Sequence, residues 1–326
     1  MKQEIIEKIN KYFLKRIPIL LFLFVLVNLF AYLPSFNIFI DIFSHFKLQY
    51  FFISIIFLLF SIYLTFINKK LLICTIISLI MIAVNLIGIC PQYIPFEPSS
   101  SNAASIKLGV FNVLTSNSQY PLLIKEIEEQ QPDIIILQET DNIWLNNIKQ
   151  LKNEYPYYIE HPRDDNFGTA LYSKIPLKST EVEKWTNLEI PVVKVCFKLN
   201  NNEIVLYGIH TLPPTGHEYI SIRNEMLKKI QGLAHSNNKN LIIAGDLNTS
   251  VFSYAFTKYI NSTKLTDAQL QNKIFKGTWN AKHPFFMRIS LDHVLYSEFL
   301  ESSEFRIGNS FGSDHLPVFV NISTKE

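Results

Sequence analysis

Six apolar stretches in the second two thirds of the sequence end, or begin, with side chains that could do chemistry. These side chains are amides, carboxylates and imidazoles, and no lysine is among them. In sequence order they are Asn112, Glu139, His210, Asp246, Asn248, Asp292, Asp314 and His315. Each alone has an ordinary explanation, such as a turn former or a residue in the first turn of a helix. Their recurrence at the same kind of position predicts that they share one site.

A set of this kind could support metal-dependent chemistry, and hydrolysis of a phosphoester is one reaction that it would suit. Oxygen atoms of carboxylates and amides suit Mg²⁺ or Mn²⁺ rather than Zn²⁺. Hydrolysis of a phosphoester needs an in-line water and a way to neutralise charge on the phosphoryl oxygens, which such a metal supplies. An Asp behind an imidazole raises the pKa of the ring, so that a histidine could meet the phosphate as a cation.

The elements that would position these residues alternate between strands and helices. Apolar runs of strand length cover 106–112, 133–138, 169–173, 192–199, 203–210, 240–246, 291–296 and 317–322. Helices are predicted at about 120–130, 142–152 and 218–235 from apolar residues spaced three and four apart. Residues 199–204 are predicted to form the turn of a hairpin between two of these strands. This pattern favours a layered α/β or α+β fold with mixed sheets, whose strand ends would converge on one rim.

The first 90 residues have a different character. Uncharged apolar stretches cover 17–33, 50–67 and 71–89, each close to the length that a bilayer core requires. We therefore predict an N-terminal membrane anchor (1–90) with three transmembrane helices, then a linker rich in proline and small polar residues (91–105), then a catalytic domain (106–326). A cleaved signal peptide is the less favoured alternative for the first stretch, because "YLPSF" after it is no small-residue cleavage site.

The distribution of basic residues predicts the orientation of the anchor. Five basic residues precede the first stretch and Lys69 and Lys70 separate the second from the third, whereas the loop 34–49 contains only Lys47. The positive-inside rule then places the N-terminus in the cytoplasm and, after three spans, the catalytic domain outside it. The Ile-, Lys- and Asn-rich composition is typical of an AT-rich bacterial genome, so we expect a bacterial plasma-membrane protein with a periplasmic or extracellular active site.

The charge of the chain argues against a tight binder of duplex nucleic acid. The 326 residues are 48% hydrophobic and carry a net charge of +2. Eight of the 30 basic and four of the 28 acidic residues precede residue 100, which leaves 22 basic and 24 acidic residues in the rest. This second part is close to neutral and lacks the positive field that duplex binding requires.

Several short motifs together resemble those of the endonuclease/exonuclease/phosphatase superfamily. They occur in the family's order over residues 106–322, and "LQE", "GDLN" and "SDH.P" in combination are specific. The matching segments are "FN" (111–112), "PDIIILQE" (132–139), "GTALYSKIPL" (168–177), "IHTLPP" (209–214), "IIAGDLN" (242–248), "GTWN" (277–280), "LDHVLY" (291–296) and "GSDHLPV" (312–318).

The resemblance implies a fold and a role for each residue. The fold would be a four-layered α/β sandwich of two packed mixed sheets flanked by helices, and the activity a Mg²⁺- or Mn²⁺-dependent phosphoesterase. Glu139 would be the main metal ligand, with Asn112 beside it and Asp314 in the metal-proximal shell. Asp246 would orient or deprotonate the attacking water and Asn248 would hold a phosphate oxygen. The remaining residues are a pair, Asp292 with His315, and His210, which would contact the scissile phosphate.

Three functions are compatible with the sequence. The first is an extracytoplasmic, membrane-anchored phosphohydrolase acting on a phosphate ester or pyrophosphate of a lipid or isoprenoid, with the lipid bilayer as partner. It is favoured because the candidate substrate loops 113–119, 211–219 and 249–256 contain no Lys or Arg, and the last two are apolar, aromatic and rich in hydroxyl side chains. The second is a tethered nuclease, with the same site as a phosphodiesterase of nucleic acid. The third is a catalytically inactive binding module, which the complete residue set disfavours.

Overall fold

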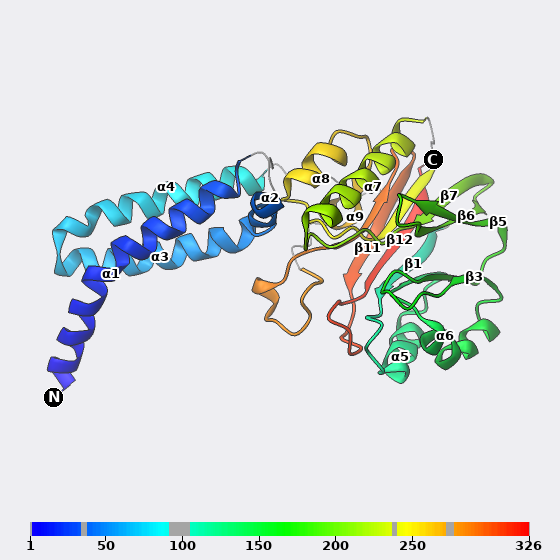
Figure 1. Cartoon of the computed structure of the whole chain (residues 1–326), viewed down its shortest axis with the longest axis horizontal. Coiled ribbons are helices and arrows are strands. Elements are labelled where there is room, and N and C mark those ends of the chain that lie inside the picture. The colour runs from blue at the N-terminus through cyan, green and yellow to red at the C-terminus, as the bar shows by residue number, and fades with distance from the viewer. Residues whose placement is uncertain (1, 34–37, 91–104, 237–239, 272–276, 326) are drawn as a thin grey trace. The chain divides into compact units, whose positions relative to one another are not determined.

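A computed structural model describes residues 2–33, 38–90, 105–236, 240–271 and 277–325. The chain divides into two compact units, Met1–Ile94 with Phe252–Tyr254, and Pro95–Val251 with Ala255–Glu326 (Figure 1). We call them the helical unit and the sandwich unit. The predicted linker, 91–105, lies outside the described residues except for Ser105.

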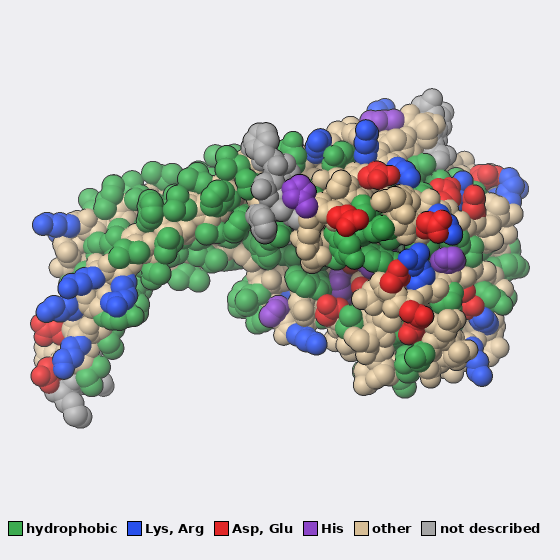
Figure 2. Space-filling view, viewed as in Figure 1, with side chains coloured by type: hydrophobic (Ala, Val, Ile, Leu, Met, Phe, Trp, Pro, Cys, Tyr) green, Lys and Arg blue, Asp and Glu red, His purple; other side chains and the backbone are tan. Residues whose placement is uncertain are grey.

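The helical unit consists of long apolar helices. Its elements are α1 (Lys2–Phe30), α2 (Ile38–Ser44), α3 (Lys47–Ile67), a 3₁₀ turn (Lys69–Leu71) and α4 (Leu72–Ile89). Within the described ranges, three segments are long and apolar enough to cross a membrane: Gln3–Phe30, Lys47–Ile67 and Lys69–Ile89. These segments contain the three predicted spans apart from residues 31–33, because α1 ends at Phe30. Figure 2 shows hydrophobic side chains over most of the visible face of these helices.

Apolar side chains face outward from this unit and a few polar ones face inward. Phe66 and Ile87 are 79% and 73% exposed, as is typical of lipid-facing positions. Inside, the side-chain amide of Asn28 donates to Asn85 Oδ1 (3.3 Å), and that of Asn85 donates to Ser54 Oγ (3.3 Å). These bonds join α1, α4 and α3. Polar contacts of this kind are among the interactions through which helices associate in a membrane.

The sandwich unit contains two six-stranded sheets, with strand orders β11-β12-β1-β2-β4-β3 and β5-β6-β7-β8-β10-β9. Both sheets are mixed, since β1 with β2 and β7 with β8 are parallel pairs and the other pairs are antiparallel. The strands are β1 (Ser105–Asn112), β2 (Ile134–Gln138), β3 (Tyr157–His161), β4 (Thr169–Ser173), β5 (Leu177–Trp185), β6 (Ile190–Leu199), β7 (Asn202–Gly208), β8 (Leu241–Asp246), β9 (Thr266–Asp267), β10 (Asp292–Tyr296), β11 (Leu300–Ile307) and β12 (Val318–Thr324).

The two sheets pack face to face and helices cover their outer faces. Val110 and Ile136 of the first sheet share a buried core with Val195 of the second. On the outer face of the first sheet, Leu123 and Ile127 pack in a second core against the strands. Figure 1 shows α5 and α6 on this side and α7 on the other. The fold is therefore the predicted four-layered α/β sandwich. The helices are α5 (Tyr120–Gln130), α6 (Asn142–Asn147), α7 (His217–His235), α8 (Tyr254–Tyr259) and α9 (Ala268–Gln271).

The predicted elements are confirmed in the centre of each sheet and incomplete at its edges. All eight predicted strands are present, and the hairpin turns at Asn200 and Asn201, both at positive φ. The predicted helix 142–152 is two pieces, α6 and a 3₁₀ turn (Lys149–Asn153). The four strands that the sequence does not predict are the edge strands of the two sheets.

The topology brings several strand ends to one edge of the sandwich. The carboxyl ends of the parallel pair β1 and β2 lie together, since Asn112 pairs with Gln138. In the second sheet β8 ends where the antiparallel β10 begins, with Asp246 opposite Asp292. This edge is the rim that the alternating pattern predicts.

Candidate active site

Asn112 and Glu139 form the part of the rim that belongs to the first sheet. The Asn112 amide Nδ2 donates to Glu139 Oε1 (2.8 Å) and to Asp246 Oδ2 (3.2 Å), and so joins carboxylates that follow strands of different sheets. The Glu139 backbone is left-handed (φ 62°), and its carbonyl accepts a hydrogen bond from Thr115 Oγ1 (2.8 Å). This turn directs the carboxylate toward the second sheet instead of along β2.

Burial affects the charge of Glu139. Desolvation raises the pKa of this carboxyl group, although the Asn112 hydrogen bond and the charge of His315 oppose the rise. The charge of Asp314 adds to the rise. The group is therefore a partly desolvated acid, with a side chain that is 13% exposed, and its ionised form gains from a nearby cation.

Asp246, Asp292 and His315 form the second part of the rim. His315 Nδ1 lies 2.8 Å from Asp292 Oδ2, and His315 Nε2 lies 3.6 Å from Asp246 Oδ2. Burial would lower the pKa of His315, but the charges of Asp292 and Asp246 outweigh it and raise this pKa well above its ordinary value. Burial would raise the pKa of Asp292, yet His315 holds it below the usual range. The pair is thus an imidazolium with a carboxylate behind it, as the motif implies.

His210 is the second histidine of the rim, and unlike His315 it is uncharged. Its Nε2 lies 3.7 Å from Asp246 Oδ2 and 4.0 Å from Glu139 Oε1. Burial, followed by the positive charge of His315, lowers the pKa of His210 to about 4. The Phe167 ring lies against the imidazole, with 5.3 Å between ring centroids. His210 is therefore neutral near pH 7 and serves as a hydrogen-bonding group rather than as a cation.

Asp246 is as deeply buried as Asp292, and each is 1% exposed. Its backbone N–H donates to Gln138 Oε1 (3.0 Å), and its Oδ1 accepts from the Asn248 backbone N–H (2.8 Å). Burial raises the pKa of Asp246 above its ordinary range, and His315 opposes this effect. A carboxylate with a raised pKa is a stronger base than an exposed one, which suits it to accept a proton from water.

The last two predicted residues flank this group. Asn248 is left-handed (φ 45°), and its amide Nδ2 donates to the Thr211 carbonyl (2.8 Å), which leaves the second hydrogen of the amide for another acceptor. Asp314 Oδ2 accepts from the indole N–H of Trp279 (3.0 Å). The structure thus brings all eight predicted residues to one rim, with Asp314 turned toward Trp279.

Buried polar residues that the sequence analysis did not assign hold this rim together. The Gln138 side chain donates to the Ile209 carbonyl and accepts from Asp246, so it links the two sheets beneath the site. Ser313 Oγ donates to the Asn112 carbonyl (2.7 Å) and accepts from the His315 N–H (3.0 Å). Gln138 lies inside the "LQE" motif and Ser313 begins the "SDH.P" motif, so both motifs were usable signals for these residues.

Two further buried side chains hold the turn that carries Asn248. The Arg223 guanidinium donates to the Asn248 carbonyl (3.4 Å) from α7. His293 Nε2 lies 2.8 Å from the Thr249 carbonyl and its Nδ1 lies 2.6 Å from Asp267 Oδ2. Because both of these partners are acceptors, His293 donates from both nitrogens. Burial opposes this cation, but Asp267 outweighs burial and raises the pKa of His293.

Comparison with known proteins identifies the family of the chain. Residues 109–315 match the sequence model of the Endonuclease/Exonuclease/phosphatase family, which is more than half of the chain. The chain belongs to this family. Enzymes of the Endonuclease/Exonuclease/phosphatase family hydrolyse phosphoester bonds, so this chain is a phosphoester hydrolase. The matched region contains all eight residues of the rim.

Solved structures of this family share the fold of the sandwich unit. A family protein of Bacteroides thetaiotaomicron is 17% identical, with TM-score 0.57, over 69% of this chain and 100% of that one. D. rerio TDP2 complexed with a single-stranded DNA product is 15% identical, with TM-score 0.57, over 68% and 100%. The B. thetaiotaomicron mannosyl-6-phosphatase Bt3783 is 18% identical, with TM-score 0.55, over 67% and 99%. At these identities the likeness shows the fold alone. A search of curated proteins found no match.

Enzymes of the family generally use divalent metal ions, and the donors at this rim fit one. Asp246 is buried and Glu139 is largely buried, and their raised pKa values reflect desolvated negative charge, which a divalent cation would stabilise. Single oxygens of Asp246 and Asp292 and a nitrogen of His315 also lie within 4.8 Å of one another. His315 is an imidazolium paired with Asp292, and a protonated ring nitrogen has no lone pair to offer a metal. We therefore expect the metal to bind at Glu139. Asn112 Oδ1 accepts from the Leu114 N–H (3.1 Å) and keeps a second lone pair, so its role as a ligand beside Glu139 stays a prediction.

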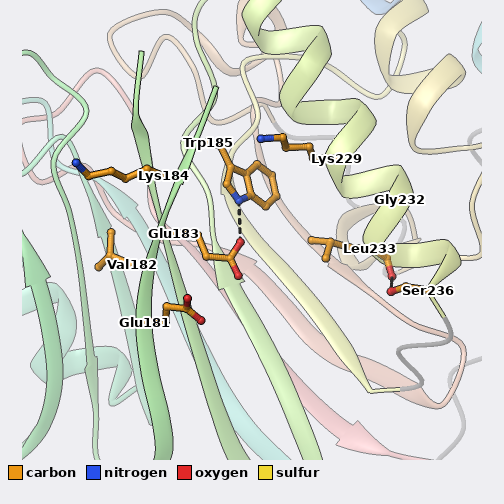
Figure 3. Close-up of a pocket in the computed structure, with 9 residues that line it drawn as sticks. All are labelled: Glu181, Val182, Glu183, Lys184, Trp185, Lys229, Gly232, Leu233 and Ser236. Carbon is orange, nitrogen blue, oxygen red and sulfur yellow. Dashed lines mark hydrogen bonds between the residues drawn. The ribbon is translucent and has the colours of Figure 1, made fainter. Parts of the chain in front are cut away.

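A groove of about 830 Å³ lies elsewhere, between β5 and α7 (Figure 3). It contains none of the eight residues of the rim. Its Trp185 donates to Glu183 (2.9 Å), and Lys184 pairs with Glu189 (2.9 Å). Lys229 lies 4.0 Å from Glu225. Because these groups are compensated within the protein, the size of the groove does not make it the site of the phosphoester chemistry.

Proposed function

We propose that this chain is a membrane-anchored, Mg²⁺- or Mn²⁺-dependent phosphohydrolase whose active site faces the outside of a bacterial plasma membrane. The substrate would be a phosphate ester or pyrophosphate carried by a lipid or isoprenoid. The observation that carries the proposal is the combination of three membrane-length apolar helices with a hydrolase rim in a unit that is close to electrically neutral. Tethering would raise the effective concentration of a substrate that lies in the same membrane.

The geometry of the rim supports a division of roles among its residues. Asp246, buried and with a raised pKa, would take the proton of the attacking water. His315, kept cationic by Asp292, would bind an oxygen of the scissile phosphate. The second hydrogen of the Asn248 amide would bind another oxygen, and neutral His210 would donate a third hydrogen bond. A metal bound at Glu139, near Asp314, would neutralise the phosphoryl charge and stabilise the leaving oxygen.

A nuclease acting at the same rim is the second candidate. The fold likeness to D. rerio TDP2, which was solved with a single-stranded DNA product, favours considering it. The charge of the sandwich unit disfavours it, because binding of nucleic acid depends on neutralising several phosphates with Lys and Arg. An inactive binding module has less support, since the rim contains every predicted residue in mutual contact or close to it.

The experiment that separates these functions is a release assay on the full chain in lipid nanodiscs. With Mg²⁺, we expect phosphate or phosphorylated product from a lipid-linked pyrophosphate or a phospholipid, and little cleavage of labelled single-stranded DNA or RNA. A control with Glu139→Gln should remove the activity. Cleavage of nucleic acid that is strong, sensitive to salt and lost in Glu139→Gln would select the nuclease instead.

A further inference from the structure

The segment between Trp279 and Ile289 exposes an unusual run of apolar side chains at its tip. We call residues 280–288 the tip loop, which is orange in Figure 1. Residues 282–287 are all exposed. Phe285, Phe286 and Met287 are consecutive, and they are 65%, 49% and 50% exposed. Three large hydrophobic side chains in one short turn exceed the scattered exposure that is ordinary on protein surfaces.

The loop is an ordered structure held by its own hydrogen bonds. Its base is closed by the Trp279 N–H, which donates to the Ile289 carbonyl (2.9 Å). The Arg288 guanidinium donates to the His283 carbonyl (2.8 Å) and to the Ala281 carbonyl (3.0 Å), so it fastens the two sides of the loop to each other. The Met287 N–H donates to the Pro284 carbonyl (2.9 Å) within the tip. The apolar side chains are therefore presented to solvent by a fixed backbone.

We propose that the tip loop docks the sandwich unit onto the surface of a lipid bilayer. Aromatic and thioether side chains at the end of a loop can enter the boundary between headgroups and acyl chains. Lys282 and Arg288 lie beside the apolar tip, and their positive charge complements anionic headgroups at the depth where such chains insert. The three membrane-length helices of the same chain keep a bilayer within reach, so a weak contact of this kind suffices.

Single-stranded nucleic acid is the other partner that aromatic and basic residues suggest, and the details favour the bilayer. Phe285 and Phe286 meet edge to face, with an interplanar angle of 88°, so they do not form a parallel platform for successive bases. Met287 has no aromatic face to stack on. The residues after position 100 contain 22 basic and 24 acidic side chains, so the unit lacks the positive field on which binding of nucleic acid depends.

The tip loop is joined directly to the rim. The Trp279 indole N–H donates to Asp314 Oδ2 (3.0 Å), and the Ala281 N–H donates to the Asp314 carbonyl (2.7 Å). Asp314 precedes His315 in the chain. A membrane contact at Phe285 and Phe286 would thus keep the rim close to the membrane surface, because the base of the loop is bonded to Asp314. This consequence for catalysis rests on the proposed function, whereas the contact with the bilayer does not.

The contact is tested by placing a tryptophan in the tip. Phe286→Trp is made in the full chain, reconstituted in nanodiscs of zwitterionic and anionic phospholipid, with acyl chains either unlabelled or brominated. The matched control is Phe299→Trp, an exposed phenylalanine (41%) beyond the opposite end of β10. The emission that each substitution adds to the native tryptophans is compared between the two kinds of nanodisc. We expect bromine to quench about half of the added Phe286→Trp emission and little of that of the control.

Equal quenching of the two variants, or quenching of neither, would overturn the proposal. A second measurement separates it from the proposed function. Phe285→Ser with Phe286→Ser should raise KM for a phosphate ester embedded in the nanodisc about tenfold and leave hydrolysis of a short-chain soluble ester unchanged. If the wild-type chain hydrolyses neither ester, the proposed function fails while the quenching result still stands. If single-stranded DNA changed the Phe286→Trp emission and brominated lipid did not, the loop would be assigned to binding of nucleic acid instead.

Discussion

The two histidines of the rim differ in charge because their neighbours differ: His315 is a cation and His210 is neutral. His315 has a carboxylate at 2.8 Å from its Nδ1 and remains cationic, whereas His210 is buried beside that cation and remains neutral. A phosphate dianion in the rim would therefore meet one positive ring and one neutral ring. Such a division between two groups of the same type is typical of sites that use one as an electrostatic partner and the other as a hydrogen-bond donor.

The charge of His315 gives a prediction for the dependence of activity on pH. Asp292, Asp246 and Asp314 face this ring and raise its pKa, and His210 is the other ionisable ring beside it. The cation therefore persists into the alkaline range, and activity should fall only as the pH passes the raised pKa. Asp292→Asn removes the largest favourable charge and leaves burial, so the alkaline limb should move down by about one to two pH units.

This shift is measured as kcat/KM against pH at saturating metal. Asp164→Asn is the control, because it removes an acid that is exposed on the surface. The control should leave the alkaline limb where it is. An alkaline limb that is identical in Asp292→Asn and the wild type would show that the charge of His315 does not govern the reaction.

The buried pair of His293 and Asp267 gives a prediction for stability. His293→Phe leaves the Asp267 carboxylate buried without its cation, which costs about 3–5 kcal/mol. In a domain of this size that is about 6–20 °C in the unfolding temperature of the sandwich unit. Adding Asp267→Leu should recover a large part of the loss, since the uncompensated charge is removed. Calorimetry of the full chain in detergent checks this, and simple additivity of the two losses would contradict it.

At the scale of elements, the sequence predicts the centre of each sheet better than its edges. The central strands are buried on both faces and read as apolar runs, so β2, β4 and β8 could be found from composition alone. The edge strand β5, "LKSTEVEKW", is largely exposed and carries charges that protect an edge from pairing with another chain. The site was predictable because its residues lie at the ends of central strands. The contacts of Arg223 and His293 with the turn at Asn248 were not predictable, because they run from a helix and from inside a strand and only the fold creates them.

The turn at the end of β8 depends on a glycine, which gives a prediction at this scale. Gly245 has φ +144°, and an added Cβ would overlap the Ile209 carbonyl and the Gln138 amide. Gly245→Ala should therefore destabilise the sandwich unit by at least about 3 kcal/mol and disturb Asp246 beside it. Gly232→Ala in α7 is the matched control. Its Cβ meets nothing within 4 Å, and it should stabilise the helix by about 0.5–1 kcal/mol.

Thermal unfolding of both variants decides between local strain and a general intolerance of substitution. We expect the unfolding temperature to fall in Gly245→Ala and to rise slightly in Gly232→Ala. A Gly245→Ala chain as stable as the wild type would mean that the turn is free to relax and does not fix the rim.

At the scale of the whole molecule, the charges around the apolar helices predict the side on which each part lies. The basic N-terminus and the Lys69–Lys70 turn should be cytoplasmic, and the sandwich unit should be outside. Alkaline phosphatase, which is active only outside the cytoplasm, should be active when fused after Glu326 and inactive when fused after Lys70. The reverse pattern would place the active site in the cytoplasm and exclude an extracytoplasmic substrate.

The measurement that tests the central claim most directly is the rate of phosphoester hydrolysis by the full chain in nanodiscs, with Mg²⁺ and after chelation. The panel of substrates contains lipid pyrophosphates, phospholipids and single-stranded DNA. We predict a rate that depends on the metal and falls at least about 1,000-fold in Asp246→Asn, because this variant lacks the base at the centre of the rim. Rates that are the same in Asp246→Asn and the wild type, or unaffected by chelation, would contradict the account.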